Sequence, residues 1–199
     1  MSVSIAYLAV ILIWSTTPLG ILWSSESVHP TMAVLLRMVI ALVPAWLIIL
    51  CSRIRMPWHK EAIQLYGYSA IGIFGGMSLS YFAAQYIPSG LMSLIFGFSP
   101  ILSGILSKYI LNDDSFSFMR KIALAVAVFG LGIVCADNLS LSDDAYIGIG
   151  MISLAVFFFS LSGVLVKSIN ISIHPLATTA GSLLFCLPLF TMTWLFADG

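Results

Sequence analysis

Apolar residues run through this chain in long blocks that short polar connections separate. Most blocks are close to the ~20 residues that an α-helix needs to cross ~30 Å of hydrocarbon, and the fifth is shorter. The blocks are apolar all round and lack the alternation of apolar and polar residues that a membrane β-barrel requires. The pattern predicts seven membrane-spanning helices at about residues 4–23, 31–51, 62–84, 90–110, 122–136, 146–166 and 176–196.

The basic residues between these blocks fall on alternate connections, and the other connections carry no lysine or arginine. Short loops that are rich in lysine and arginine stay in the cytoplasm. We therefore expect a multi-pass protein of the inner or plasma membrane with its N-terminus in the cytoplasm. The residues concerned are Arg53, Arg55, Lys60, Lys108, Arg120, Lys121 and Lys167.

The composition excludes a soluble domain. The chain is 60% hydrophobic and 8% charged, whereas about a quarter of the residues in a soluble domain are charged. A net charge of zero argues against a nucleic-acid partner. The first block has no basic start and no cleavage site of small residues, so we expect it to remain as a helix. Cys51, Cys135 and Cys186 are isolated, which predicts neither a disulfide framework nor a metal site.

Small residues allow helices to approach closely in lipid, where apolar attraction between helices contributes little. The third block has the spacing G-x-x-x-G at Gly72 and Gly76. A weak internal repeat is also present, because His29-Pro30 and His174-Pro175 each precede an apolar block. If the repeat is structural, each unit holds five helices, and the odd number inverts the second unit. Inverted repeats are typical of secondary transporters that bind substrate near the midplane.

Several motifs occur in a characteristic order and spacing. They are I-W-S-T-T-P at residues 13–18, His29-Pro30 followed by Arg37, Y-F-A-A-Q-Y at 81–86 before P-S-G at 88–90, and F-S-P-I-L at 98–102. Together they resemble the EamA-type transporters of the drug/metabolite transporter superfamily. The chain departs from that family at residues 111–114, where L-N-D-D replaces a turn similar to Leu-Gly-Glu.

The resemblance implies a polytopic all-helical membrane bundle of ten helices in two inverted five-helix repeats. Such proteins move amino acids, other metabolites or drugs across the plasma membrane, often outward. Residues 1–138 would form the first repeat, and 139–199 would form the start of the second. We then expect the last three of the ten helices to be lacking. Another chain or a second copy in a homodimer would supply them. We also expect the last two helices to pack loosely or to pair with another chain, and the chain not to transport alone. The alternative is a non-transporting membrane remnant or assembly partner without an alternating-access cycle.

Arg37 is the one basic residue that lies well inside an apolar block. A charge within the hydrocarbon costs about 2.5 to 3.5 kcal/mol on insertion scales. Arg37 lies about 10 Å from the start of its helix, at 1.5 Å per residue. Two interpretations stay open: Arg37 stabilises the fold by reaching carbonyls or headgroups, or it binds an anionic group of a small-molecule substrate in a central cavity.

Pro18 and Pro100 each remove a backbone donor and leave a carbonyl unpaired within an apolar block, so we expect a substrate pathway beside them. Hydroxyl and aromatic side chains lie at similar depth on several predicted helices. The alternative for each serine is a bond to the preceding helical turn. The predicted substrate-binding residues are Trp14, Thr17, Arg37, Tyr81, Ser93, Phe96, Pro100 and Ser160.

Catalytic motifs are absent from the sequence. It contains no G-x-x-x-x-G-K-[ST], H-E-x-x-H or G-x-S-x-G pattern. His29 and His174 begin blocks on opposite membrane faces, and His59 lies on a polar turn beside Lys60 and Glu61. We therefore expect neither an enzyme nor a bound cofactor or metal.

Overall fold

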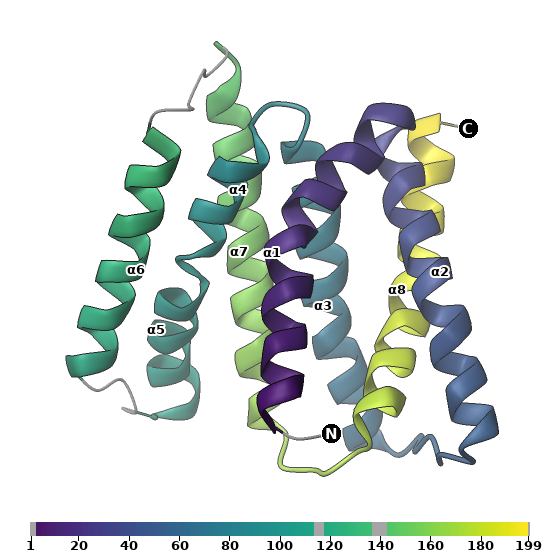
Figure 1. Ribbon diagram of the computed structural model, residues 1–199. Helices are drawn as coiled ribbons and strands as arrows, with labels where there is room; N and C mark the ends of the chain where they lie inside the picture. The colour runs from purple at the N-terminus through teal and green to yellow at the C-terminus, as the bar shows by residue number, and fades with distance from the viewer. Residues whose placement is uncertain (1–2, 114–117, 137–142, 199) are drawn as a thin grey trace.

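The computed structural model describes residues 3–113, 118–136 and 143–198. Helices are the only regular secondary structure in these ranges, which confirms the all-helical class. Figure 1 shows a bundle in which consecutive spanning segments run in opposite directions, with α4 and α5 forming one segment. The helices are α1 (Val3–Ser27), α2 (Pro30–Cys51), α3 (Lys60–Ala83), α4 (Ser89–Phe96), α5 (Ser99–Leu111), α6 (Phe118–Ala136), α7 (Ala145–Ser168) and α8 (Pro175–Asp198).

Apolar length determines where these helices lie. Each predicted block corresponds to one helix, except that the fourth block holds both α4 and α5. Among the described residues, five segments are long and apolar enough to cross a membrane. The chain is therefore a multi-pass membrane protein. The five segments are Tyr7–Glu26, Pro30–Cys51, Ser89–Leu111, Ala145–Ser168 and Pro175–Ala197.

Proline begins both α2, at Pro30, and α8, at Pro175. Proline suits the first helical turn because its φ is fixed near the helical value and its missing N–H would have no helical partner there. The two helices start at opposite ends of the bundle, so α7 and α8 run opposite to α1 and α2 (Figure 1). Inverted repeats require these directions. The predicted boundary between residues 138 and 139 lies outside the described residues, and the repeat stays a prediction.

The central helix is α3, which packs against α7, α8 and α2. Glycines make the contact with α7 close. A Cβ added at Gly72 would lie 2.5 Å from Ser162 Cβ, and one added at Gly75 would lie 2.8 Å from Phe158 Cγ. Helices in lipid associate through this kind of close backbone approach. The glycines on α3 therefore explain why α7 packs there.

The expectation that the last two helices pack loosely is wrong. Helix α7 buries Ile152 and Ala155 completely. Gly181 of α8 lies against the buried ring of Tyr66, where an added Cβ would be 2.7 Å from Tyr66 Cδ1. Helix α6 instead lies at one edge of the bundle, beside α4 and α5 (Figure 1). The expectation failed because α3, within the predicted first repeat, carries the surfaces that bind α7 and α8.

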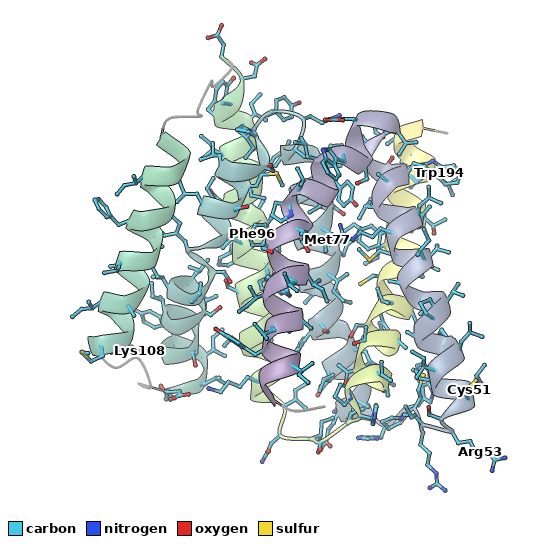
Figure 2. All side chains as sticks on the ribbon, viewed as in Figure 1. Cys51, Arg53, Met77, Phe96, Lys108 and Trp194 are labelled. Carbon is cyan, nitrogen blue, oxygen red and sulfur yellow. The ribbon has the colours of Figure 1, made fainter. Side chains whose placement is uncertain are left out.

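Basic side chains lie together at one end of the bundle. Figure 2 shows Arg53 and Lys108 at the end opposite Trp194. Lys167 at the C-terminal end of α7 forms an ion pair with Asp113, with 2.6 Å between Lys167 Nζ and Asp113 Oδ2. The fold therefore gathers basic residues from three separate connections on one face, which we call the basic end.

Candidate functional site

A cavity of about 510 Å³ lies between α1, α2, α3, α4 and α7. Its size is in the range of small-molecule binding sites. Figure 2 labels two lining residues, Met77 and Phe96, at mid-height of the bundle. The lining residues are Ile13, Trp14, Ser15, Thr17, Pro18, Ile21, Arg37, Gly72, Ile73, Gly76, Met77, Ser80, Met92, Ser93, Phe96, Gly97 and Phe159.

Arg37 is the one charged side chain among the described residues that line this cavity. It is half-buried, and none of the hydrogen bonds or ion pairs within the described part of the chain involves it. A charge in the membrane interior needs a compensating partner. The guanidinium is therefore available to a group that enters the cavity.

The hydroxyl groups of the cavity wall donate to their own helices. Ser15 Oγ donates to the Leu12 carbonyl at 3.0 Å, and Thr17 Oγ1 donates to the Ile13 carbonyl at 2.7 Å. Ser80 and Ser93 donate to carbonyls one turn earlier at 2.6 and 2.9 Å. This is the bond to the preceding turn that is common for serine and threonine in membrane helices. These hydroxyls face a ligand mainly with acceptor lone pairs.

Aromatic rings form one wall of the cavity. The ring centroid of Phe159 lies 5.4 Å from the ring centroid of Trp14 and 6.2 Å from that of Phe96. Both pairs meet edge to face. Such contacts add to the burial of the ring surfaces. We call Trp14, Phe96 and Phe159 the aromatic wall, which joins α1, α4 and α7 across the cavity.

The fourth span is broken beside this cavity. Helix α4 ends at Phe96 and α5 begins at Ser99, with Gly97 and Phe98 between them. Pro100 has no N–H and cannot donate to the Phe96 carbonyl, so the regular helix ends there. Across the break, Ser160 Oγ of α7 donates to the Ser99 carbonyl at 3.2 Å. Ser160 therefore holds the start of α5 to α7, while α4 before the break lines the cavity.

This bond predicts a stability effect for Ser160→Ala. Loss of a hydrogen bond costs about 0.5–1.5 kcal/mol, which lowers Tm by about 1–6 °C for a domain of this size. Thermal unfolding of the purified protein in detergent measures the shift. Ser153→Ala on the same helix is the control, because Ser153 Oγ bonds only the Ile149 carbonyl of its own helix at 2.7 Å. Equal Tm values for the two variants would contradict the role of Ser160.

The structure brings five of the predicted substrate-binding residues to the cavity: Trp14, Thr17, Arg37, Ser93 and Phe96. It places the other three elsewhere. The buried Tyr81 hydroxyl accepts a hydrogen bond from Ser24 Oγ at 3.2 Å, which joins α3 to α1. Ser160 is buried at the helix break, and Pro100 is exposed on α5.

Sequence reasoning missed other lining residues, mainly on α3, and one on α7. Gly76, Met77 and Phe159 line the cavity, but each was an ordinary member of an apolar block. Only packing distinguishes Phe159 from its neighbours Phe157 and Phe158. The G-x-x-x-G spacing on α3 was the available signal, and we favoured a helix contact over a ligand role for it.

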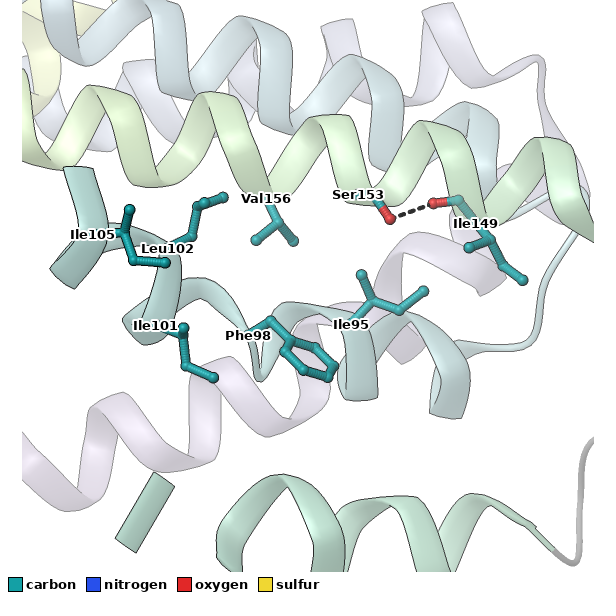
Figure 3. Close-up of a pocket in the computed structure, with 8 residues that line it drawn as sticks. All are labelled: Ile95, Phe98, Ile101, Leu102, Ile105, Ile149, Ser153 and Val156. Carbon is teal, nitrogen blue, oxygen red and sulfur yellow. Dashed lines mark hydrogen bonds between the residues drawn. The ribbon is translucent and has the colours of Figure 1, made fainter. Parts of the chain in front are cut away.

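A second, apolar groove of about 330 Å³ lies between the broken span and α7 (Figure 3). No charged side chain lines it among the described residues. Its one hydroxyl, on Ser153, is bonded to the Ile149 carbonyl. The groove therefore offers a ligand mainly apolar contacts. Its lining residues are Ile95, Phe98, Ile101, Leu102, Ile105, Ile149, Ser153 and Val156.

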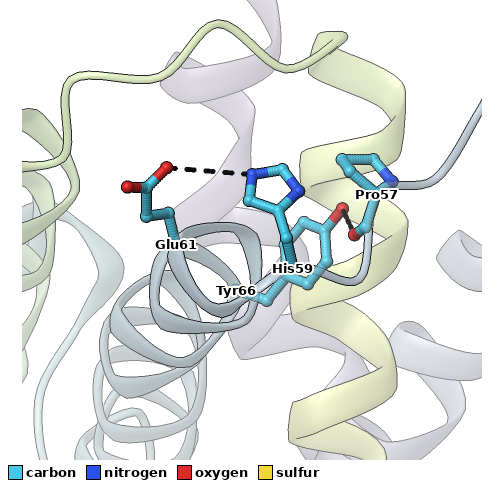
Figure 4. A network of polar contacts seen from close by, with 4 residues as sticks. All are labelled: Pro57, His59, Glu61 and Tyr66. Atoms are coloured by element: carbon cyan, nitrogen blue, oxygen red, sulfur yellow. Dashed lines mark hydrogen bonds and ion pairs between the residues drawn. The ribbon is translucent and has the colours of Figure 1, made fainter.

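Titratable residues gather at the start of α3, away from the cavity. Figure 4 shows His59 and Glu61, whose Nε2 and Oε2 atoms are 4.0 Å apart, and Tyr66, whose hydroxyl donates to the Pro57 carbonyl at 3.1 Å. The His59 and Glu61 side chains are more than half exposed. Within the described ranges, no three His, Cys, Asp or Glu side chains are grouped to hold a metal ion.

A family model for the EamA-like transporter family matches residues 1–136, which is about two thirds of the chain. The chain belongs to the EamA-like transporter family. The predicted membership in the drug/metabolite transporter superfamily is therefore confirmed. No individual curated protein matches the chain. An EamA-like chain with several apolar spans is a membrane transporter of the drug/metabolite type, and the family is not one of enzymes.

Proposed function

We propose that this EamA-like protein is a secondary transporter that binds a small organic solute in the central cavity. The observation that carries the proposal is Arg37, the one charged side chain among the described residues that line this cavity of about 510 Å³, which bonds no other described residue. Binding sites of this size are mostly apolar and hold a few polar groups that orient the ligand. Transport is driven by a gradient, since the sequence has no phosphate-binding loop for ATP hydrolysis. We infer export across the plasma membrane as its direction.

The arrangement of the helices supports an alternating-access cycle. Helices α1 and α2 run opposite to α7 and α8, and the cavity lies between α1 and α7. Transporters of inverted-repeat type bind substrate between their repeats and use interrupted helices at that point. We infer that Gly97 and Phe98 act as a hinge that lets α4 move relative to α5.

Uptake into vesicles tests the proposal directly. The purified protein is reconstituted into lipid vesicles, and uptake is measured for a panel of labelled organic anions, amino acids and cationic dyes. Saturable uptake of at least one solute above protein-free vesicles supports a transporter and contradicts the expectation that this chain does not transport alone. If no solute enters above that background, the proposal fails and the alternative of a non-transporting assembly partner gains support.

Orientation is a separate prediction. The positive-inside rule places the basic end in the cytoplasm, and with it the N-terminus. Cys51 is exposed at that end of α2. In a Cys135→Ala, Cys186→Ala background, we expect an impermeant maleimide to label Cys51 in inverted vesicles but not in intact cells.

The matched control for orientation moves the thiol to the other end of the bundle. Glu26→Cys, introduced with Cys51→Ala in the same background, replaces an exposed residue near the end of α1. We expect this thiol to react in intact cells. The reverse pattern, with Cys51 labelled in intact cells and the thiol at position 26 protected, would overturn the orientation.

A further inference from the structure

We propose that the cavity selects an organic monoanion, a carboxylate attached to an apolar aromatic body, over zwitterions and cations. This inference rests on the proposed function and adds the chemical class of the substrate. It follows from three properties of the cavity wall: its charge, the direction of its hydrogen bonds, and the position of its aromatic rings.

The first property is an unbalanced charge. Arg37 lines the cavity, and no aspartate or glutamate does so among the described residues. A ligand carboxylate can therefore neutralise the guanidinium. A ligand ammonium would find no carboxylate, and Arg37 would repel it in surroundings of low dielectric constant, where screening is weak. A zwitterion gains the first interaction but buries its ammonium without a charged partner, which is costly.

The second property is the direction of the hydrogen bonds. The lining hydroxyls donate their hydrogen bonds to carbonyls of their own helices. They belong to Ser15, Thr17, Ser80 and Ser93. They keep acceptor lone pairs, which do not stabilise an anion. The guanidinium of Arg37 has five N–H donors in a planar fork that fits both oxygens of a carboxylate. Arg37 is therefore the strongest donor in the wall, and a carboxylate can accept two parallel hydrogen bonds from it.

The third property is the aromatic wall. Trp14, Phe96 and Phe159 offer ring surfaces from α1, α4 and α7. An aromatic ring of a ligand can pack against these rings in the same edge-to-face or offset geometry. The rest of the lining is mainly apolar, with Ile73 and Met77 on α3 and Met92 on α4. A ligand with a charged end and an apolar ring therefore matches the whole cavity.

Four labelled solutes with one ring and different charge test this inference. They are 3-phenylpropanoate (anion), 3-phenylpropanamide (neutral), phenylalanine (zwitterion) and 2-phenylethylamine (cation). Equilibrium binding is measured at pH 7 with the purified protein in lipid nanodiscs. We expect 3-phenylpropanoate to bind at least about tenfold more tightly than each of the others, because a charge-assisted hydrogen bond is worth that much or more.

Two variants assign the selectivity to Arg37. In Arg37→Gln, the carboxylate and the amide should bind with similar affinity, because the charge that distinguishes them is gone. Arg53→Gln is the control at the basic end, outside the cavity, and should keep the wild-type preference. This comparison detects a change in selectivity, which a general loss of folding would not produce.

The outcomes separate failure of this inference from failure of the proposed function. Equal or tighter binding of phenylalanine or 2-phenylethylamine overturns the inference but leaves the proposed transport intact. Failure of all four solutes to bind, with uptake of another solute in the vesicle panel, also overturns the inference alone. If neither binding nor uptake of any solute is seen, the proposed function fails together with the inference.

Discussion

Transport by an Arg37→Gln variant is expected to fall by about ten- to a hundredfold, while the amount of protein in the membrane stays near normal. Arg37 faces the cavity and bonds no other described residue, so its loss removes a ligand contact and no contact within the described fold. A hydrogen bond to a charged group contributes about 1.5–3 kcal/mol, which corresponds to that change in affinity. Vesicle uptake and quantitative immunoblotting of membranes measure the two quantities.

The control for this prediction is Arg37→Lys, which keeps the positive charge but loses the planar fork. We expect intermediate transport and unchanged abundance for this variant. If abundance in Arg37→Gln falls in proportion to transport, Arg37 stabilises the fold, and the interpretation of its role as a ligand contact is wrong.

Gly148→Ala is expected to destabilise the protein by about 1–3 kcal/mol, the usual cost of overpacking. Gly148 lies where α7 meets the end of α3. An added Cβ would lie 2.8 Å from Tyr86 Cβ, 2.9 Å from Ile87 Cγ2 and 3.3 Å from the Ala83 carbonyl oxygen. These atoms belong to backbone or to the base of side chains, so they cannot move aside without a shift of the helices. Thermal unfolding in detergent should show Tm lowered by about 2–12 °C.

Gly150 provides a control two residues further along the same helix. No atom lies within 4 Å of a Cβ built there. Alanine is favoured over glycine in a helix by up to about 1 kcal/mol, so Gly150→Ala should keep or raise Tm. A Gly148→Ala variant that is as stable as Gly150→Ala would show that α7 does not pack closely on the end of α3.

The positions of the spans were predictable because hydrophobic length alone determines them. Pro100 also marked the region where the fourth span breaks, since the missing N–H acts locally. The packing order was not predictable from the same pattern. Helices that are apolar all round have no distinct inward face, and the close contacts of Gly72 and Gly181 become visible only in three dimensions.

The candidate site was predictable to the extent that its residues are chemically unusual in a membrane. Arg37, Trp14 and Ser93 differ from an apolar background, and all three line the cavity. The hydroxyls of Tyr81 and Ser160 are equally unusual among apolar residues, but in the fold they join helices and do not line the cavity. The sequence could not predict Phe159 as a site residue, because phenylalanine is common in apolar blocks. Only its contacts with Trp14 and Phe96 place it in the aromatic wall.

Blocking the cavity with a covalent label tests most directly whether solute passes through it. Ser93 lines the cavity and Ser153 lines the apolar groove, and both donate to a carbonyl one turn earlier in their own helix. Ser93→Cys and Ser153→Cys are made in a cysteine-free protein, labelled with N-ethylmaleimide in detergent, checked for complete labelling by mass, and reconstituted. The solute with the highest uptake in the vesicle panel is then measured. We predict that labelling reduces uptake to that of protein-free vesicles for Ser93→Cys and leaves Ser153→Cys unchanged. Undiminished uptake by fully labelled Ser93→Cys would contradict the assignment of this cavity as the transport site.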